Sequence, residues 1–329
     1  MIKLEHINKR FESEKGETVF KLEDVNINIE EGDIFGIIGY SGSGKSTLLK
    51  IINSLETADS GSLFIDGKNV NALSKKEKIL ELSKIGSVIQ NVNLFENRTV
   101  FDNISFPLKQ AGLKKAKVQE RVEKLLTVVE LADKGKSYPL ELSDGQKQRV
   151  AIARAIAAEP KILLLDEATG NLDPATTKAI LLLLKKIHKE FSLTLVIVAH
   201  QMNVIKEICH HVAVLDNGRV VEQGEVYQIF ANPKSELTKK FIKSTSSLSK
   251  VEELIASDSP ITRLTAWQKI VRLTYLEKNI SEPLIATLTA EFAVIPNIIF
   301  ADIEIVQDAP IGGTVAIFSG NEKAVDSAL

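Results

Sequence analysis

The chain has 329 residues, more than one average domain requires, and this length predicts two domains with ample material for a buried core. Its 41 basic and 43 acidic residues give a net charge of −2 at pH 7. This balance excludes the overall positive field that nucleic-acid binding usually requires, so we expect no nucleic-acid partner. The only cysteine is Cys209, which excludes intrachain disulfides and a cysteine-rich metal site.

Two features of the sequence bear on the location of the chain. The longest apolar runs, such as residues 162–165, 179–184 and 195–199, are far shorter than the roughly 20 residues that span a bilayer. The first residues include the acidic Glu5, and no apolar core of the kind found in signal peptides follows it. We therefore expect a peripheral protein that stays on the cytoplasmic side and docks on a membrane protein.

Strand-like and helical patterns alternate from residue 1 to about residue 243, which predicts an α/β layered domain with a largely parallel core sheet. Leading strands fit residues 1–8 and 19–29. Later core strands, apolar almost throughout as in strands buried on both faces, fit residues 85–90, 162–165 and 195–199. Helical patterns fit residues 118–130, 146–158 and 175–190. The last helix has a clear start, because Asp173 suits its N-cap and Pro174 its first turn.

A glycine-rich run follows the apolar residues 34–38 and precedes a helix-like stretch at 48–52. Residues 39–47 read Gly-Tyr-Ser-Gly-Ser-Gly-Lys-Ser-Thr, a complete G-x-x-x-x-G-K-[ST] phosphate-binding loop. Glycines let successive backbone N–H groups point inward, Lys45 reaches the β and γ phosphates, and the Ser46 hydroxyl ligates magnesium. The helix that follows adds the positive end of its dipole. The predicted phosphate-binding residues are Gly39, Ser41, Gly42, Ser43, Gly44, Lys45, Ser46 and Thr47.

Two carboxylates end the predicted strand at residues 162–165. Asp166 stands where it would hold magnesium directly or through water. Glu167 is a candidate general base for an attacking water. Two acids at the end of a strand also occur in plain turns, so this pair alone does not decide the chemistry.

A second motif precedes the alanine-rich helix at 150–158. Residues 142–149 read Leu-Ser-Asp-Gly-Gln-Lys-Gln-Arg, and the Asp166-Glu167 pair follows at a characteristic distance. This combination resembles the signature motif of ATP-binding cassette (ABC) proteins, and the resemblance covers about the first 243 residues. It implies a P-loop NTPase fold of the ABC type, with ATP and Mg²⁺ as cofactors.

The resemblance also implies roles for residues outside the phosphate loop. Gln90 would sense magnesium, as one of its ligands, and couple the site to a membrane partner. His200 would contact the γ-phosphate, Phe11 would stack on adenine, and the loop at 171–173, with Asp173, would cross a dimer interface. Ser143, Gly145 and Gln146 would bind the ATP of a second subunit through the start of their helix. The catalytic residues implied in this way are Glu167, His200, Gln90 and Ser143.

The signature motif departs from the family at Asp144, where the family has glycine. A carboxylate pointing at the γ-phosphate would impair hydrolysis. A carboxylate pointing outward would act as a harmless first-turn acid that complements the helix dipole. Intact Ser143, Gly145 and Gln146 favour the outward position.

The run at 93–104 corresponds to the region that receives a short permease helix in the family. Phe95, Phe101 and Phe106 would line such a groove, although packing in the core is an equal alternative for any one of them.

The remaining residues predict a linker and a second domain. Residues 244–260 are serine-rich and polar, as linkers are. Strands fit residues 263–275, 297–306 and 314–319, and a helix fits 282–292, a β-α-β-β order that begins a small α+β domain at 261–329.

The tail from residue 228 onward resembles that of the ATPase subunits of methionine importers. Their C-terminal NIL-like regulatory domain is of the ferredoxin-like type and binds methionine. After residues 321–324 the chain stops at Leu329, so we expect a shortened domain without a last strand. A surviving dimerisation module is the alternative to a methionine sensor.

These features together predict the ATP-hydrolysing subunit of a homodimeric amino-acid importer, with methionine as the first candidate cargo. Two permease subunits and an external substrate-binding protein would be its partners, and a regulatory amino acid would bind the second domain. An exporter or lipoprotein-release ATPase, an importer of another solute, a soluble cassette protein and a nucleotide-binding scaffold remain alternatives.

Overall fold

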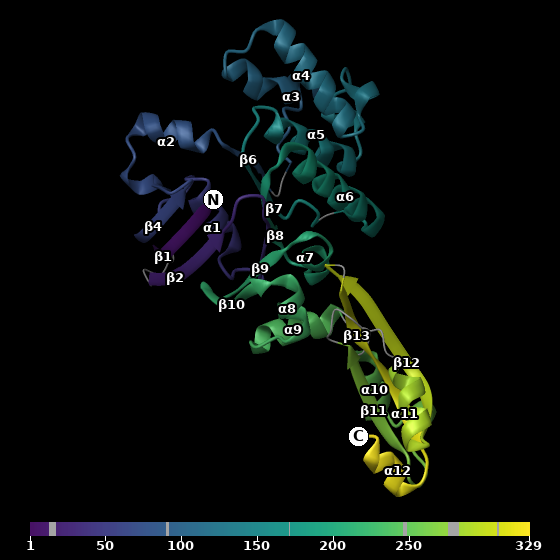
Figure 1. Ribbon diagram of the computed structural model, residues 1–329. Helices are drawn as coiled ribbons and strands as arrows, with labels where there is room; N and C mark the ends of the chain where they lie inside the picture. Colours follow the sequence, from purple (N-terminus) through teal and green to yellow (C-terminus); the bar gives the residue numbers. More distant parts are fainter. Residues whose placement is uncertain (13–17, 90–91, 171, 246–248, 276–282, 308) are drawn as a thin grey trace. The chain divides into compact units, whose positions relative to one another are not determined.

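The computed structural model describes residues 1–12, 18–89, 92–170, 172–245, 249–275, 283–307 and 309–329. These residues form two compact units, Met1–Gly224 and Glu225–Leu329 (Figure 1). Among the described helices, none is both long enough and apolar enough to cross a bilayer.

A six-stranded sheet forms the centre of the first unit, in the order β10-β9-β3-β8-β7-β6. Its strands are β3 (Ile34–Ile38), β6 (Ile85–Val88), β7 (Ile162–Asp166), β8 (Thr194–Ala199), β9 (His211–Asp216) and β10 (Arg219–Glu225). The pairs that join β9, β3, β8, β7 and β6 are all parallel. Every residue of β3 and β8 is buried, which explains the continuous apolar runs in the sequence.

The two leading strands belong to a separate antiparallel sheet, which the sequence did not indicate. This sheet has the order β2-β1-β4-β5, with β1 (Ile2–Glu12), β2 (Thr18–Ile29), β4 (Ser60–Ile65) and β5 (Lys68–Asn69). Alternate residues such as Ile2 and Leu4 face the core, as expected of a sheet with one buried face. Helix α1 (Lys45–Ile52) fills the core with residues such as Leu48 and Ile52, which share one apolar cluster with both sheets.

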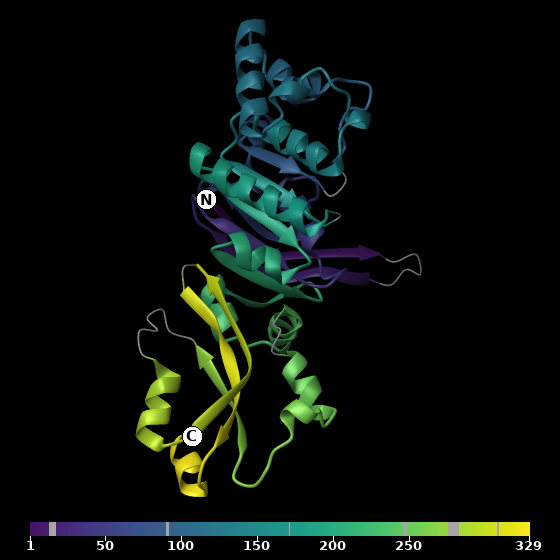
Figure 2. The same cartoon turned by 90° about the vertical axis from the view of Figure 1, so that its right-hand side faces the viewer.

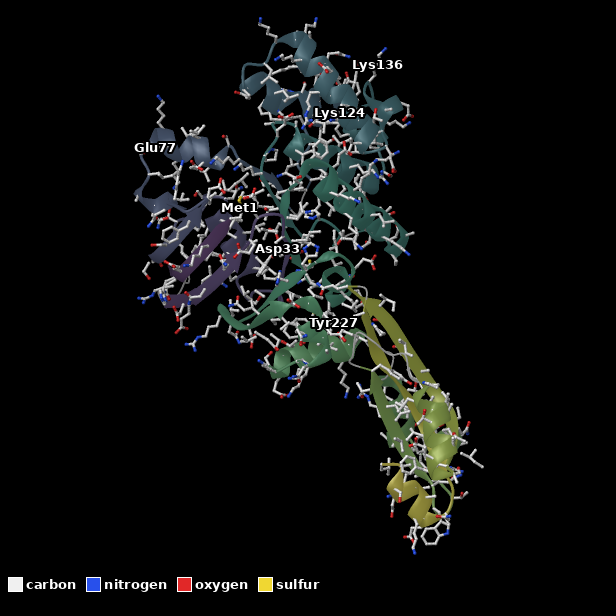
Figure 3. All side chains as sticks on the ribbon, viewed as in Figure 1. Met1, Asp33, Glu77, Lys124, Lys136 and Tyr227 are labelled. Carbon is white, nitrogen blue, oxygen red and sulfur yellow. The ribbon has the colours of Figure 1, made fainter. Side chains whose placement is uncertain are left out.

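The other longer helices of the first unit are α2 (Lys75–Leu82), α3 (Val100–Gln110), α4 (Lys115–Val128), α5 (Asp144–Ile156), α6 (Pro174–Phe191) and α7 (Met202–Ile208). Helices α3, α4 and α5 gather at one end of the unit, the upper end in Figure 1. The three helices expected from the sequence are α4, α5 and α6. They begin three, two and one residues earlier than expected, respectively. Figure 3 shows Lys124 and Lys136 at the α3–α4 end, whereas Asp33 lies within the unit.

The second unit contains a three-stranded antiparallel sheet in the order β11-β13-β12. Its elements are α8 (Val226–Ala231), α9 (Glu236–Thr245), α10 (Ser249–Ala256), β11 (Lys269–Tyr275), α11 (Leu284–Phe292), β12 (Ile295–Val306), β13 (Ala309–Ser319) and α12 (Glu322–Ser327). The β-α-β-β order expected from the sequence is present.

Both faces of this sheet are covered by helices. Phe318 of β13 packs with Leu288 of α11 and Val325 of α12 on one face. Val315, of opposite parity on the same strand, packs with Val251 of α10 on the other face, and Figure 2 shows α10 and α11 on opposite sides of the strands. Helix α10 lies within residues 244–260, so the segment predicted as a linker contributes a buried side chain to the second unit.

Candidate active site

The phosphate loop joins β3 to α1 in a conformation that requires glycine. Gly42 and Gly44 have φ values of 82° and 106°, in the left-handed region. A Cβ atom on Gly44 would lie 2.5 Å from the carbonyl oxygen of Lys21, and one on Gly39 would lie 2.3 Å from that of Leu215. The loop is therefore closely surrounded by backbone, and only glycine fits at these positions.

The start of α1 has the properties of an anion site. Its N-cap residue is Gly44, which offers no side chain to the first N–H groups of the helix. The Ser43 hydroxyl is buried and has no hydrogen-bond partner among the described residues. Unpaired donors at the positive end of a helix dipole attract phosphate oxygens.

Lys45 places a buried cation in the same loop. Its side chain is only 4% exposed, and its Nζ donates to the carbonyl oxygens of Gly39 at 2.8 Å and Tyr40 at 3.0 Å. Burial lowers the pKa of this ammonium group, against the opposing effect of the Glu167 and Asp166 carboxylates. A phosphate group would stabilise its positive charge better than two neutral carbonyl groups do.

Ser46 and Asp166 lie together beside this cation. The Ser46 hydroxyl donates to Oδ1 of Asp166 at 3.4 Å, which connects the first turn of α1 to the end of β7. Burial and the neighbouring Glu167 carboxylate raise the pKa of Asp166. Hydroxyl and carboxylate oxygens are the ligands that Mg²⁺ prefers, and magnesium commonly takes only one or two protein groups beside substrate phosphates. The pair therefore fits the predicted metal. Gln90, the other predicted ligand, lies outside the described residues.

Glu167 and His200 meet at the carboxyl ends of β7 and β8. Oε1 of Glu167 is in close contact with Nε2 of His200. The backbone of Glu167 has a φ of 50°, unusual for a residue other than glycine, and its N–H donates to the carbonyl of Val198 at 3.1 Å. Ligands bind at this edge of parallel sheets. The structure thus brings Lys45, Ser46, Asp166, Glu167 and His200 to one edge of the central sheet.

Ser143 begins helix α5 with a capping box. Its Oγ accepts from the N–H of Gln146 at 3.3 Å, and its own N–H donates to Oε1 of Gln146 at 3.0 Å. Gly145 packs against α6, where a Cβ atom would lie 2.5 Å from Cγ2 of Thr176. Among the described residues, no hydrogen bond or ion pair joins Ser143 or Gly145 to the phosphate loop of the same chain, so these residues form a second, separate group.

Asp144 points away from the core. Its side chain is 79% exposed, and Oδ1 lies 3.5 Å from Nζ of Lys147, one turn along α5. This is the outward position that the intact neighbouring residues favour in the sequence.

The remaining predicted residues lie at two other places. Asp173 is the N-cap of α6, and its Oδ1 accepts from the N–H groups of Ala175 and Thr176, both at 3.0 Å. Phe11 lies near the end of β1 and is 38% exposed, with the Lys9 ammonium 5.1 Å from the centroid of its ring. Asn171, which precedes Asp173 in the predicted interface loop, lies outside the described residues.

Arg154 is a residue that the sequence reading missed. It lies on α5, and its guanidinium donates to the carbonyl oxygens of Val92 at 3.1 Å and Asn93 at 3.0 Å. Burial lowers the pKa of this group. Helix α5, which begins with the signature motif and is called the signature helix below, is therefore hydrogen-bonded to the segment that follows Gln90. The one sequence feature that could have indicated this contact is the position of an arginine within an alanine-rich helix.

The half-buried phenylalanines of the predicted groove include a pair of rings tilted by 60° to each other. The rings of Phe95 and Phe106 lie 4.9 Å apart, and the exposed Arg98 guanidinium lies 4.8 Å and 5.4 Å from their centroids. Phe101 is also half-buried. These rings are thus partly accessible from the α3 end of the unit.

Comparison with known proteins agrees with this geometry. Residues 22–170 match the family model of the ABC transporter and residues 269–329 that of the NIL domain. The fold and the site define an ATPase of the ATP-binding cassette class. Over 329 residues, all of this chain, it is 44% identical to the methionine import ATP-binding protein MetN 1 of Enterococcus faecalis (strain ATCC 700802 / V583), covering 92% of that protein. It is also 44% identical over its full length to MetN of Vibrio vulnificus (strain YJ016), covering 95% of that protein. The chain belongs to the family of methionine import ATP-binding proteins.

A solved structure shows the same cassette. The dimeric post-hydrolysis state of the ATP-binding cassette MJ0796, bound to ADP and Pi, is 36% identical with a TM-score of 0.63, and the match covers 69% of this chain and 99% of that one. The chain is thus an enzyme that hydrolyses ATP, with its reaction coupled to transport.

Proposed function

We propose that this chain is the ATP-hydrolysing subunit of a methionine importer, working as a homodimer at the cytoplasmic face of the membrane. The observation that carries the proposal is the full-length identity of 44% to a methionine import ATP-binding protein, which includes the second unit as well as the cassette. Its partners would be two permease subunits and an external substrate-binding protein. The NIL match at 269–329 supports an importer over an exporter or lipoprotein-release ATPase.

ATP binding would begin with an exchange of partners at Lys45. The β- and γ-phosphate oxygens replace the carbonyls of Gly39 and Tyr40 as acceptors of its ammonium group, and they also accept from Ser43 and the first N–H groups of α1. The exposed face of Phe11 offers a stacking surface for adenine. At Lys45, Ser43 and the start of α1, unpaired or weakly paired donors would thereby gain charge-assisted hydrogen bonds.

Hydrolysis would use Glu167 as the proton acceptor. Its carboxylate takes a proton from the water that attacks the γ-phosphate in line. His200 holds Oε1 of Glu167 in the structure, so the imidazole has to turn from the carboxylate to the γ-phosphate before the water is activated. Ser46 and Asp166 would hold Mg²⁺, and the ion, when bound, supplies positive charge to the phosphate oxygens. Ser143 of the second subunit would complete the site from the opposite side.

The half-buried rings of Phe95 and Phe106 support a contact with a permease. Arg98 lies over Phe95 and Phe106, and Arg154 fastens the adjoining segment to the signature helix. A permease helix seated on these rings would thereby reach both α5 and the segment after Gln90. This arrangement suits the transfer of nucleotide-driven movement to a membrane partner.

The second unit offers a place for a regulatory amino acid. Small-ligand sites have volumes of roughly 300–1,000 Å³. The cavity beside α11 measures about 610 Å³ and has Tyr275, Leu284, Ala286, Ile303 and Pro310 in its walls. Its lining is predominantly apolar, as a thioether side chain would require. We infer that methionine binds here and regulates transport.

Uptake by cells tests the cargo. Deletion of the gene from its own cell should abolish high-affinity uptake of labelled L-methionine, and reintroduction of the gene should restore it. A panel of other labelled amino acids serves as the control, because their uptake should remain unchanged. Full methionine uptake in the deletion strain, with loss of another solute, would replace methionine by that solute.

A further inference from the structure

A second cavity lies inside the first unit, next to the proposed proton acceptor. It measures about 320 Å³, and its walls come from three segments: the start of α5, residues 92–96, and the loop that follows β7. Its lining residues include Leu94, Lys147, Gln148, Glu167 and Gly170. The cavity therefore joins the signature helix to the loop that carries Glu167 toward α6.

Gln148 lines this cavity and carries an unsatisfied donor. Its side chain is only 4% exposed, and Nε2 has no hydrogen-bond partner within the described part of the chain. A buried amide without an acceptor raises the free energy of the state that contains it. A conformation in which a residue of the cavity wall accepts a hydrogen bond from Nε2 of Gln148 would therefore have a lower free energy than one in which Nε2 is unpaired.

Asn103, in the same unit, is a buried amide whose hydrogen bonds stabilise the folded structure. Asn103 is fully buried, and its Nδ2 donates to the carbonyl oxygens of Phe95 at 3.2 Å and Thr99 at 3.0 Å. Its Oδ1 accepts from the N–H of Phe95 at 2.8 Å. Gln148 makes no such bonds from Nε2 to the described residues, so its amide donor does not stabilise the folded structure as that of Asn103 does.

The loop after β7 forms a further wall of the cavity. Among its described residues, the Gly170 N–H donates to the Glu167 carbonyl at 3.0 Å and the Leu172 N–H donates to the Thr169 carbonyl at 3.3 Å. The loop begins with the left-handed backbone of Glu167. In the proposed mechanism, His200 separates from Glu167 before hydrolysis. This separation changes the contacts of Glu167, the residue with which the loop begins.

We propose that Gln148 is a positioning residue for ATP hydrolysis. In the state competent for hydrolysis, its Nε2 donates to a backbone carbonyl of the loop at 168–170 and so fixes Glu167 relative to the signature helix of its own chain. The signature helix also faces the ATP of the second subunit, so this bond connects the two sites of the dimer. The inference depends on ATP hydrolysis and is independent of the cargo.

The first test is Gln148→Leu in the full chain, purified by an affinity tag with the partners it binds in its own cell. The substitution removes the donor and keeps the volume, so we expect kcat for ATP hydrolysis to fall about tenfold, the loss of one hydrogen bond in the transition state. KM for ATP should stay within about twofold, since Gln148 does not contact the nucleotide. The melting temperature should stay equal or rise, because a buried unpaired amide is removed.

Two matched variants separate positioning from folding. Gln119→Leu, on the exposed face of α4, should leave kcat and the melting temperature unchanged. Asn103→Leu should lower the melting temperature, because its buried partners lose their bonds. An unchanged kcat in Gln148→Leu, or a fall in kcat accompanied by a lower melting temperature as in Asn103→Leu, would overturn the proposal.

The variant Gln148→Glu adds a pH signature. A protonated carboxyl group donates a hydrogen bond, whereas a carboxylate only accepts. The ratio of its kcat to the wild-type kcat should therefore rise as the pH falls. A ratio that is constant from about pH 6 to pH 8 would show that donation at this position is not used.

Discussion

At the residue scale, the site is defined by polar groups that the fold leaves incompletely paired. Among the described residues, the buried hydroxyl of Ser43 has no hydrogen-bond partner, and Lys45 donates only to the neutral carbonyls of Gly39 and Tyr40. Folded domains satisfy nearly all buried polar groups, so exceptions of this kind mark places where a ligand completes the pairing. Both exceptions lie at the start of α1, where the helix dipole adds to the attraction for an anion.

Replacement of Lys45 tests this interpretation. Lys45→Ala removes a buried charge that would contact the phosphates, and a charge-assisted hydrogen bond contributes about 1.5–3 kcal/mol. We expect ATP to bind about ten- to a hundredfold more weakly in calorimetric titration. Lys50→Ala, on the exposed side of the same helix, is the control and should bind as the wild type does. Undiminished affinity in Lys45→Ala would contradict the assignment of the loop.

Replacement of Glu167 tests the proton acceptor. Glu167→Gln keeps the shape and removes the base, so ATP should still bind and promote dimers while kcat falls by about 100- to 10,000-fold. Nucleotide titration, size-exclusion chromatography with ATP, and phosphate release measure the three quantities. Turnover at the wild-type rate would assign the base to another residue.

Most of the residues of this site were predictable, because they are local in the sequence. The glycines of residues 39–44 and the cap at Ser143 reveal their conformations within a few positions. The pairing of Arg154 with the Val92 carbonyl and the orphaned amide of Gln148 were not predictable, since both depend on segments that meet only in the folded chain. The roles inferred for the site residues, among them Glu167, His200 and Gln90, stay predictions.

At the element scale, strands were easier to recognise than to assign to sheets. Residues 1–8 and 19–29 carry strand patterns, yet nothing local shows that they pair antiparallel with each other and with β4. Sheet partners are set by tertiary packing, whereas helix ends are set by caps such as Asp173.

Asp33 connects two elements of the central sheet that lie far apart in the sequence. It precedes β3, is 6% exposed, and lies 3.2 Å from Nδ1 of His210 and 2.9 Å from Nδ1 of His211 at the start of β9. Burial by itself would raise the pKa of Asp33, but the hydrogen bonds and charges of the two histidines outweigh it and hold the pKa below its usual value.

The depressed pKa leads to a prediction about stability. A carboxyl whose pKa is lower in the folded state contributes stability above its unfolded pKa, near the ordinary value of 3.8, and loses that contribution as the pH falls through the folded pKa. Asp33→Asn should therefore lower the free energy of unfolding at neutral pH by about 1.5–3 kcal/mol. The difference from the wild type should shrink below the ordinary pKa of Asp.

Denaturant unfolding at several pH values measures this difference. Asp133→Asn, at a side chain that is 76% exposed, is the control and should match the wild type at every pH. A deficit in Asp33→Asn that persists unchanged at low pH would assign the effect to packing instead of charge.

At the scale of the whole molecule, two compact units carry two kinds of chemistry. The first has the phosphate loop and its carboxylates, and the second has a predominantly apolar cavity beside α11. A substitution that fills this cavity should therefore separate regulation from hydrolysis.

Ala286→Phe places an aromatic ring in the wall of the cavity, so we expect loss of methionine binding in calorimetric titration with L- and D-methionine. ATP binding should stay at the wild-type level. Ala290→Phe, exposed on the same helix and outside the cavity lining, is the control and should retain methionine binding. Equal methionine binding by both variants would remove the cavity from consideration as the regulatory site.

The central position of β3 has a consequence for the synthesis of the chain. Its neighbours in the sheet are β8 and β9, and Ile34 pairs with Leu195 while Phe35 pairs with His211. At about 5–20 residues per second, a ribosome delivers these partners on the order of ten to thirty seconds after β3 itself. During that interval β3 is an apolar strand with both edges unpaired, and such segments aggregate readily. Nascent chains of this protein should therefore depend on chaperones until β9 emerges from the ribosome.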